Sequence, residues 1–226
     1  MTSISSTSDT EKVRRYYDRH TASFLSYGQG GTQGCIHRAV WGPGVKTREQ
    51  AFHYVENIIA ATLITHSMTT EATHIIDLGC GIGASLCHIA HEFPIHGTGV
   101  TLSPVQSRIA NNRIHAASLD QRIRCIEGDY SDLTLALPEA DLAYAIESFV
   151  HSPVPEAFFA QCKRVVRPGG LLLICDDVLQ APTDPRAVPF IERFKRGWQV
   201  HTLIERPQLK QMALEAGFKH CSTTDL

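Results

Sequence analysis

The segment spanning residues 73–83 places the strongest constraint on the fold of this 226-residue chain. Its apolar run, Ile75-Ile76 and then Leu78, is typical of a parallel strand that is buried on both faces. A glycine at every second position from Gly79 to Gly83 follows, and without a Cβ the backbone can turn tightly and approach a ligand. Residues 84–90 continue as a helix whose first N–H groups face the turn. The segment therefore predicts the strand–turn–helix unit of a nucleotide-binding α/β sheet.

The glycine turn alone leaves two cofactor classes open, because it also fits the G-x-G-x-x-G/A pattern of dinucleotide-binding proteins. Asp77 lies two residues before the first glycine, at the end of the strand. A nicotinamide enzyme places a ribose-binding acid at the end of the next strand, and this chain has Thr101 there. The pattern D-x-G-x-G-x-G after an apolar strand resembles motif I of the class I S-adenosylmethionine (SAM) methyltransferases. A nicotinamide oxidoreductase remains the remote alternative.

Strand-like and helix-like segments alternate through the rest of the chain. Strands are predicted near residues 95–102, 122–127, 141–146, 170–175 and 218–223, and helices near 104–117, 155–166, 190–200 and 207–216. This order predicts an α/β fold with a Rossmann-like, doubly wound, mostly parallel sheet. The segment after the last helix is too short to form both the sixth strand and the antiparallel seventh strand with which class I methyltransferases usually end. Either the chain is truncated or the sheet edge is completed differently, for instance by a second copy in a homodimer.

Composition divides the chain into three predicted parts. Residues 1–10 are rich in Ser and Thr and predict a disordered tail. Residues 11–66 predict an N-terminal helical lid that also contacts the acceptor, with Thr47 capping a helix over 48–65. Residues 67–226 predict the SAM-binding core. The lid is predicted because aromatic segments flanked by glycine favour binding loops, although its aromatic residues can also serve only in packing.

Further motifs extend the resemblance over residues 75–218. Residues 99–106 are similar to the second motif of cyclopropane-synthase-like methyltransferases, and residues 144–153 to a signature of sterol and tocopherol C-methyltransferases. The resemblance implies that Asp77 meets the amino-acid end of SAM, that Thr101 and Gln106 bind its ribose, and that Asp129 accepts from its adenine. The implied cofactor-binding residues are Asp77, Gly79, Cys80, Gly81, Thr101, Leu102, Gln106, Asp129, Tyr130 and Ile146.

The segment that follows the fourth predicted strand contains two candidate catalytic bases. Glu147 and His151 follow a strand end, where ligands bind in open α/β sheets, and their spacing would place them on one face of a helix. Either can instead serve a structural role. The candidate acceptor-binding residues from the lid are Tyr16, Tyr17, His37, Arg38 and Trp41. An acceptor that carries a diphosphate would have Arg14, Arg15, Arg38 and Arg48 as its natural partners.

The resulting prediction is a SAM-dependent methyltransferase that acts on a small-molecule acceptor. C-methylation of an isoprenoid-like or other alkene, including a prenyl diphosphate, is the first choice, because it agrees with the signature around Ala145-Ile146-Glu147 and with the aromatic lid. O- or N-methylation of a specialised metabolite is the second. A non-catalytic SAM-binding partner protein is the alternative from another class.

Charge and cysteine content exclude several other classes. The formal net charge is −2, which does not favour a broad nucleic-acid interface. No apolar run approaches membrane-spanning length, so we expect a cytoplasmic protein without a membrane partner. The seven cysteines are scattered, which predicts reduced thiols. No metal is predicted: His88, His91 and His96 fit a solvated face, although Asp176-Asp177 leaves the question open.

Overall fold

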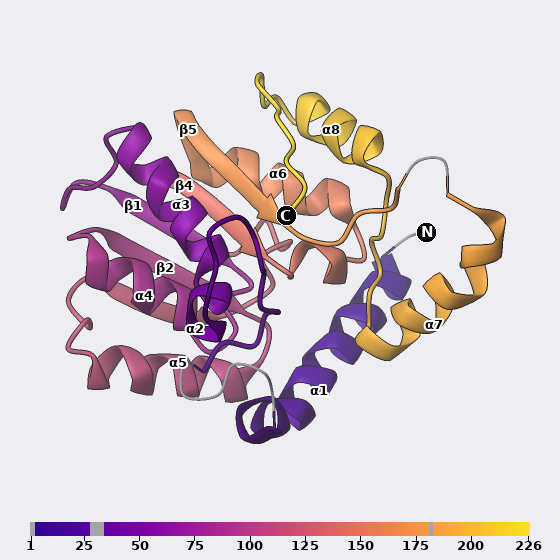
Figure 1. Ribbon diagram of the computed structural model, residues 1–226, viewed down its shortest axis with the longest axis horizontal. Helices are drawn as coiled ribbons and strands as arrows, with labels where there is room; N and C mark the ends of the chain where they lie inside the picture. Colours follow the sequence, from indigo (N-terminus) through magenta and orange to yellow (C-terminus); the bar gives the residue numbers. More distant parts are fainter. Residues whose placement is uncertain (1–2, 28–33, 181–182) are drawn as a thin grey trace.

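The computed structural model describes residues 3–27, 34–180 and 183–226. Its centre is a parallel sheet with the strand order β3-β2-β1-β4-β5 (Figure 1). The strands are β1 (His74–Leu78), β2 (His96–Thr101), β3 (Ile123–Glu127), β4 (Ala140–Ile146) and β5 (Val166–Cys175). The order reverses between β1 and β4, which is where open α/β sheets bind ligands. The predicted Rossmann-like α/β fold is thus confirmed.

Helices cover both faces of the sheet and complete two apolar cores. The helices of the chain are α1 (Ser3–Tyr27), α2 (Arg48–Phe52), α3 (Tyr54–Thr65), α4 (Ala84–Glu92), α5 (Pro104–Ala116), α6 (Pro155–Val165), α7 (Val188–Trp198) and α8 (Arg206–Glu215). One core joins the sheet to α3, α4 and α5, and the other joins it to α6 and α8. Ile75 belongs to the first core and Ile76 to the second, and both are fully buried. A fully buried side chain of this size contributes about 1.5–3 kcal/mol, so β1 anchors both layers.

The strand β5 begins earlier than predicted and contains an irregularity. Ala140 of β4 is opposite Val166, and Leu142 is opposite Leu171, so residues 167–170 bulge out of the ladder. Gly169 lies within this bulge, and its φ of +83° favours glycine. Beyond it, the register is regular to Cys175, which brings the end of β5 level with the end of β4.

The N-terminal part differs from the prediction at two points. Residues 3–10, predicted as a disordered tail, belong to α1, and residues 1–2 lie outside the described part of the chain. The single helix predicted over 48–65 is interrupted at His53, which separates α2 from α3. Thr47 caps α2 as expected, because its hydroxyl accepts from the backbone N–H of Gln50 at 3.2 Å. In Figure 1, α1 lies outside the helical layers of the sheet and next to α7.

The C-terminal part contains no sixth strand. Residues 218–223, predicted as a strand, are irregular, and the sheet keeps five strands within the described residues. The chain instead forms α7 and α8, with one isolated parallel bridge between Leu179 and Glu205. The antiparallel strand that the sequence predicted to be missing is not formed by the described residues. None of the described helices has the length and apolar character required to cross a bilayer.

Candidate active site

A cavity of about 430 Å³ opens at the carboxyl ends of β1, β2, β4 and β5. It therefore lies at the point where the strand order reverses. Segments from α1, α7 and the loop before α2 form its other walls. The residues that line it are Val13, Tyr17, Phe24, Cys35, Ile36, His37, Arg38, Asp77, Gly79, Cys80, Gly81, Ile82, Ala84, Ser85, Thr101, Leu102, Ser103, Gln106, Tyr130, Ile146, Glu147, Ser148, Val150, His151, Asp176, Asp177, Phe194 and Trp198.

The glycine turn after β1 forms the floor of the cavity. The N–H groups of Gly79 and Cys80 both donate to the carbonyl of Val100 at 2.9 Å, which fixes the turn against β2. Gly79 has a φ of +97°, and a Cβ there would lie 2.3 Å from the Cβ of Ser148. A Cβ on Gly81 would meet only Ile36, at 3.8 Å, so at this position the backbone leaves open space. The turn thus presents main-chain atoms to the cavity.

Asp77 lies at the end of β1, where it lines the cavity while its side chain is 3% exposed. Burial raises the pKa of its carboxyl group to about 7. A carboxyl group held in this way is stabilised in its charged form by a cationic ligand, because an ammonium group compensates for the lost hydration. The carboxyl group of Asp77 therefore fits the ammonium group at the amino-acid end of SAM.

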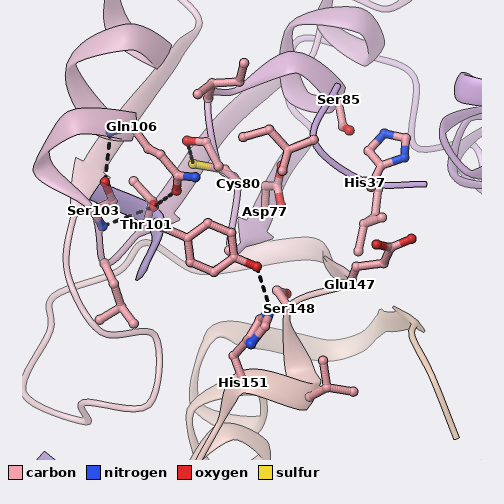
Figure 2. Close-up of a pocket in the computed structure, with 18 of the residues that line it drawn as sticks. His37, Asp77, Cys80, Ser85, Thr101, Ser103, Gln106, Glu147, Ser148 and His151 are labelled. Carbon is pink, nitrogen blue, oxygen red and sulfur yellow. Dashed lines mark hydrogen bonds between the residues drawn. The ribbon is translucent and has the colours of Figure 1, made fainter. Parts of the chain in front are cut away.

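Polar side chains at the end of β2 face the same cavity (Figure 2). The hydroxyl of Thr101 donates to Oε1 of Gln106 at 2.8 Å, and Ser103 caps α5 by accepting from the N–H of Gln106 at 3.1 Å. These groups can bind ribose hydroxyls without adding charge. The predicted pair, Thr101 and Gln106, is thus brought together, and Ser103, which was not among the predicted binding residues, lies beside it.

Of Asp129 and Tyr130, which the sequence predicted to bind the cofactor at the corner after β3, only Tyr130 lines the cavity. Tyr130 lines the cavity and donates its hydroxyl to the carbonyl of Ser148 at 2.7 Å. Asp129 is absent from the lining, and its carboxylate accepts from the N–H of Ser131 at 2.7 Å. The arrangement of Asp129 is that of a turn-forming residue.

His151 carries the best-defined hydrogen bonds in the site. Its Nδ1 lies 3.0 Å from the carbonyl oxygen of Gln199, and its Nε2 lies 2.7 Å from the hydroxyl of Tyr17. A carbonyl can only accept, so Nδ1 carries the proton and Nε2 accepts from Tyr17. Burial lowers the pKa of His151, which keeps the imidazole neutral. Figure 2 shows His151 below the cavity, with its hydrogen bond directed into it. A neutral imidazole with a basic Nε2 is suited to take a proton from a ligand.

Glu147 is held differently from the helical arrangement that its spacing with His151 suggested. It precedes the short 3-10 helix Phe149–His151 and has a φ of +48°, which is uncommon for a side chain with a Cβ. Its Oε1 accepts from the backbone N–H of Arg38 at 3.0 Å and from the Nε of Arg38 at 3.1 Å. The same guanidinium donates to Asp177 at 2.9 Å. Glu147 therefore binds the loop before α2 and is less available as a base than His151.

A buried polar network lies behind the loop before α2. The Oε1 of Glu56, in α3, accepts from Nε2 of His37 at 2.9 Å and from the hydroxyl of Ser85 at 2.7 Å. Burial opposes the charge on His37, but hydrogen bonds to Cys35 and Glu56 raise its pKa to about 11. His37 is thus a cation paired with a buried carboxylate, and it lines the cavity as predicted.

The other predicted acceptor-side residues divide into two groups. Tyr17 and Arg38 line the cavity. Tyr16 does not, and its ring makes an edge contact with Tyr17 at 5.3 Å between centroids. Trp41 also lies outside the lining and is 62% exposed. The glycine after Trp41 thus indicated a loop, but not the direction in which its ring points.

The sequence reasoning did not identify the aromatic and acidic walls. Phe24 of α1 stacks on Trp198 of α7 at 6.3 Å, and Phe194 lies one turn before Trp198. The sequence contains one indication of this aromatic wall, because Phe190, Phe194 and Trp198 follow one another at intervals of four residues and so share one face of a helix. Asp176 lines the site after β5, and burial raises its pKa to about 7. The lining also contains Ser148, which follows Glu147 directly.

Three of the four arginines expected to bind a diphosphate do not line the cavity, whereas the fourth, Arg38, lines it and pairs there with Glu147 and Asp177. Arg14 pairs with Glu11 at 2.6 Å and with Asp18 at 2.8 Å. Arg15 pairs with Glu11, and Arg48 lies 5.7 Å from the ring centre of Phe52. The cavity wall itself carries several carboxyl groups, those of Asp77, Glu147, Asp176 and Asp177. The charge of the wall therefore does not favour a polyanionic acceptor.

Comparisons with known proteins agree with this arrangement. The methyltransferase domain family matches residues 76–174. An O-methyltransferase of Pyrenophora dematioidea is 31% identical over 221 residues, which are 95% of this chain and 78% of that protein. An O-methyltransferase of Aspergillus nomiae is 28% identical over 215 residues, which are 95% of this chain and 92% of that protein.

Solved structures share the fold at low sequence identity. The geranyl diphosphate C-methyltransferase of Streptomyces coelicolor A3(2), in complex with Mg²⁺, geranyl diphosphate and S-adenosyl-L-homocysteine, has a TM-score of 0.69 at 17% identity. The alignment covers 92% of this chain and 78% of that one. The cyclopropane synthase MmaA2 of Mycobacterium tuberculosis has a TM-score of 0.74 at 16% identity, over 92% of this chain and 74% of that one.

Proposed function

Since the chain belongs to the class I SAM-dependent methyltransferases, we propose that it transfers the methyl group to a hydroxyl oxygen of a largely apolar small molecule. The observation that carries the proposal is the neutral imidazole of His151, with Nδ1 held by Gln199 and Nε2 directed into the cavity. Fungal relatives described as O-methyltransferases support the same acceptor atom.

The chain's own residues provide the parts that this reaction needs. SAM supplies an electrophilic methyl group on a sulfonium. Asp77, Thr101 and Gln106 lie where they can hold the amino and ribose groups of SAM and so fix the direction of attack. Phe24, Phe194 and Trp198 exclude water from the acceptor side. Once the hydroxyl of Tyr17 has moved away, Nε2 of His151 takes the proton of the acceptor hydroxyl and so increases the nucleophilicity of the oxygen. The O–C bond forms as the C–S bond of SAM breaks, with S-adenosylhomocysteine as the leaving group.

C-methylation of an alkene is the second candidate function. Phe24, Trp198 and the carboxylate of Glu147 could stabilise a carbocation, because aromatic faces and anions attract positive charge. Support for a prenyl acceptor comes from structural neighbours of low identity, including the geranyl diphosphate enzymes. The paired arginines of this chain weigh against a diphosphate acceptor.

Incubation with methyl-labelled SAM and matched acceptors tests the proposal. A panel of phenols and enols is compared with their O-methylated analogues, in which the oxygen is blocked, and with prenyl alcohols and diphosphates. We expect label only in acceptors with a free hydroxyl, and a loss of transfer in His151→Gln with unchanged S-adenosylhomocysteine affinity. Label on carbon in the blocked analogues would overturn O-methylation in favour of C-methylation. Cofactor binding with no transfer to any acceptor would indicate a non-catalytic binding protein.

A further inference from the structure

The strongest unassigned feature is a buried cluster of metal-binding side chains behind the loop before α2. Cys35 lies on that loop, His53 at the break between α2 and α3, and Glu56 on the first turn of α3. One donor atom from each residue lies within 4.8 Å of the other two. Cys35 is 3% exposed and Glu56 is fully buried. From this geometry we propose that Cys35, His53 and Glu56 bind one Zn²⁺ ion.

The carboxylate of Glu56 provides an independent reason for a cation. Its Oε1 is occupied by His37 and Ser85, but Oε2 is buried without a hydrogen-bond partner among the described residues. A buried carboxylate oxygen without a partner is unfavourable, because its lost hydration is not replaced. A metal ion bound to Oε2 would replace the lost hydration. The interactions of His37 and Ser85 with Oε1 would then orient the carboxylate, as hydrogen bonds commonly do for metal ligands.

The other two ligands have suitable chemistry. The ring of His53 stacks on the ring of His88 at 4.0 Å between centroids, with an interplanar angle of 7°, so its orientation is fixed. An imidazole nitrogen is a common zinc ligand in proteins. Sulfur, nitrogen and oxygen together suit zinc more than magnesium or calcium, which prefer oxygen alone.

The distances are compatible with zinc after a small contraction. Zinc bonds of about 2.0–2.3 Å place tetrahedral donor atoms roughly 3.5 Å apart. The donors at 4.8 Å or less therefore need to close by about 1 Å, which side-chain rotation can supply. Three protein ligands leave a fourth position for water.

The site would attach a wall of the active site to the core. Cys35 begins the cavity-lining run that continues to Arg38, whereas Glu56 belongs to α3, which packs against the sheet. A zinc ion would therefore fix the loop over the glycine turn. We expect its removal to weaken S-adenosylhomocysteine binding several-fold and to lower the melting temperature.

The proposal is tested on the full chain, dialysed against a chelator and then titrated with ZnCl₂. We expect one equivalent of zinc by elemental analysis. Replacement by Co²⁺ should produce a thiolate-to-metal charge-transfer band. Cys35→Ser and His53→Gln should each lose the equivalent and the band, whereas Cys221→Ser, which changes a distant thiol, should keep both. Circular dichroism establishes whether each variant is folded.

Absence of stoichiometric zinc in the wild type would overturn the proposal, as would bound Co²⁺ without a thiolate band. The cobalt spectrum needs only the wild type, so it decides the question even where a variant fails to fold. Both measurements are independent of methyl transfer. Their failure is therefore distinguishable from failure of the proposed O-methyltransferase activity.

Discussion

Replacing Asp77 with Asn should stabilise the ligand-free protein at alkaline pH and yet weaken cofactor binding. The side chain is 3% exposed, and burial raises its pKa from 3.8 to about 7. An acid whose pKa is raised in the folded state does not change the free energy of unfolding at a pH where both states are protonated. The free energy of unfolding falls from about pH 4, where the unfolded chain ionises, and reaches its lower limit above about pH 7, where the folded state ionises as well. Asn removes this ionisation while retaining the size of the side chain.

The magnitude follows from the two pKa values. A difference of about three units corresponds to at most about 4 kcal/mol of lost stability at pH 8, at 1.36 kcal/mol per unit. About 2–3 kcal/mol of that loss develops between pH 5 and pH 8. The wild type should therefore lose this much stability relative to Asp77→Asn over that interval. Asp176, whose pKa is also raised to about 7, is present in both proteins and cancels in the comparison.

Denaturant unfolding of both proteins at pH 5, 6, 7 and 8, without ligand, measures the difference directly. Glu71→Gln serves as the control, because this residue is exposed and forms no ion pair among the described residues, and it should follow the wild type at every pH. Calorimetry should show that Asp77→Asn binds S-adenosylhomocysteine at least ten-fold more weakly, since the ammonium loses its charged partner. Parallel stability curves for wild type and Asp77→Asn, or unchanged ligand affinity, would refute the assignment of Asp77.

Other consequences of the geometry can be measured separately. His151→Gln should lower kcat about 10²–10³-fold without changing S-adenosylhomocysteine affinity, as expected for the loss of a general base; an equal loss of affinity would indicate a structural role. The pKa of His151 is lowered by burial, so the neutral base predominates above pH 6.5, and kcat/KM should show its rising limb below that value; a limb centred above pH 7 would exclude His151. Gly79→Ala should lower the free energy of unfolding by about 1–3 kcal/mol and impair cofactor binding, because the φ of +97° and the contact with Ser148 both exclude a Cβ; a fully stable, active variant would contradict this.

The part of the cavity to which we assign the cofactor was predictable because its signals are local. The run from Ile75 to Leu78 shows a doubly buried strand, and the glycines show a turn that main-chain atoms must approach. Asp77 and Thr101 then follow from their positions at strand ends, where a parallel sheet brings residues distant in sequence to one edge. For Asp129 the role in adenine binding stays a prediction, because one oxygen of its carboxylate forms the turn by accepting from the N–H of Ser131.

The acceptor half depends on long-range contacts, which local patterns do not encode. Tyr17 meets His151 across 134 positions of sequence, and Arg38 meets Glu147 across 109. The spacing of Glu147 and His151 suggested a helix, but the backbone of Glu147 is left-handed. Its N–H donates to the carbonyl of Cys175 in β5 at 2.8 Å, a contact across 28 positions that the local sequence does not reveal.

The contact between Tyr17 and His151 couples the N-terminal helix to the proposed chemistry. Nε2 of a neutral imidazole has a single lone pair, and the hydroxyl of Tyr17 occupies it at 2.7 Å. An acceptor hydroxyl can donate to the same atom only after Tyr17 moves away. Tyr17 belongs to α1, which is held to the core where the hydroxyl of Ser103 donates to Asp18 at 2.5 Å, and Ser103 in turn caps the helix that follows Thr101. The end of β2 to which we assign cofactor binding and the proposed base are therefore joined through one helix, so that acceptor entry and the position of α1 depend on each other.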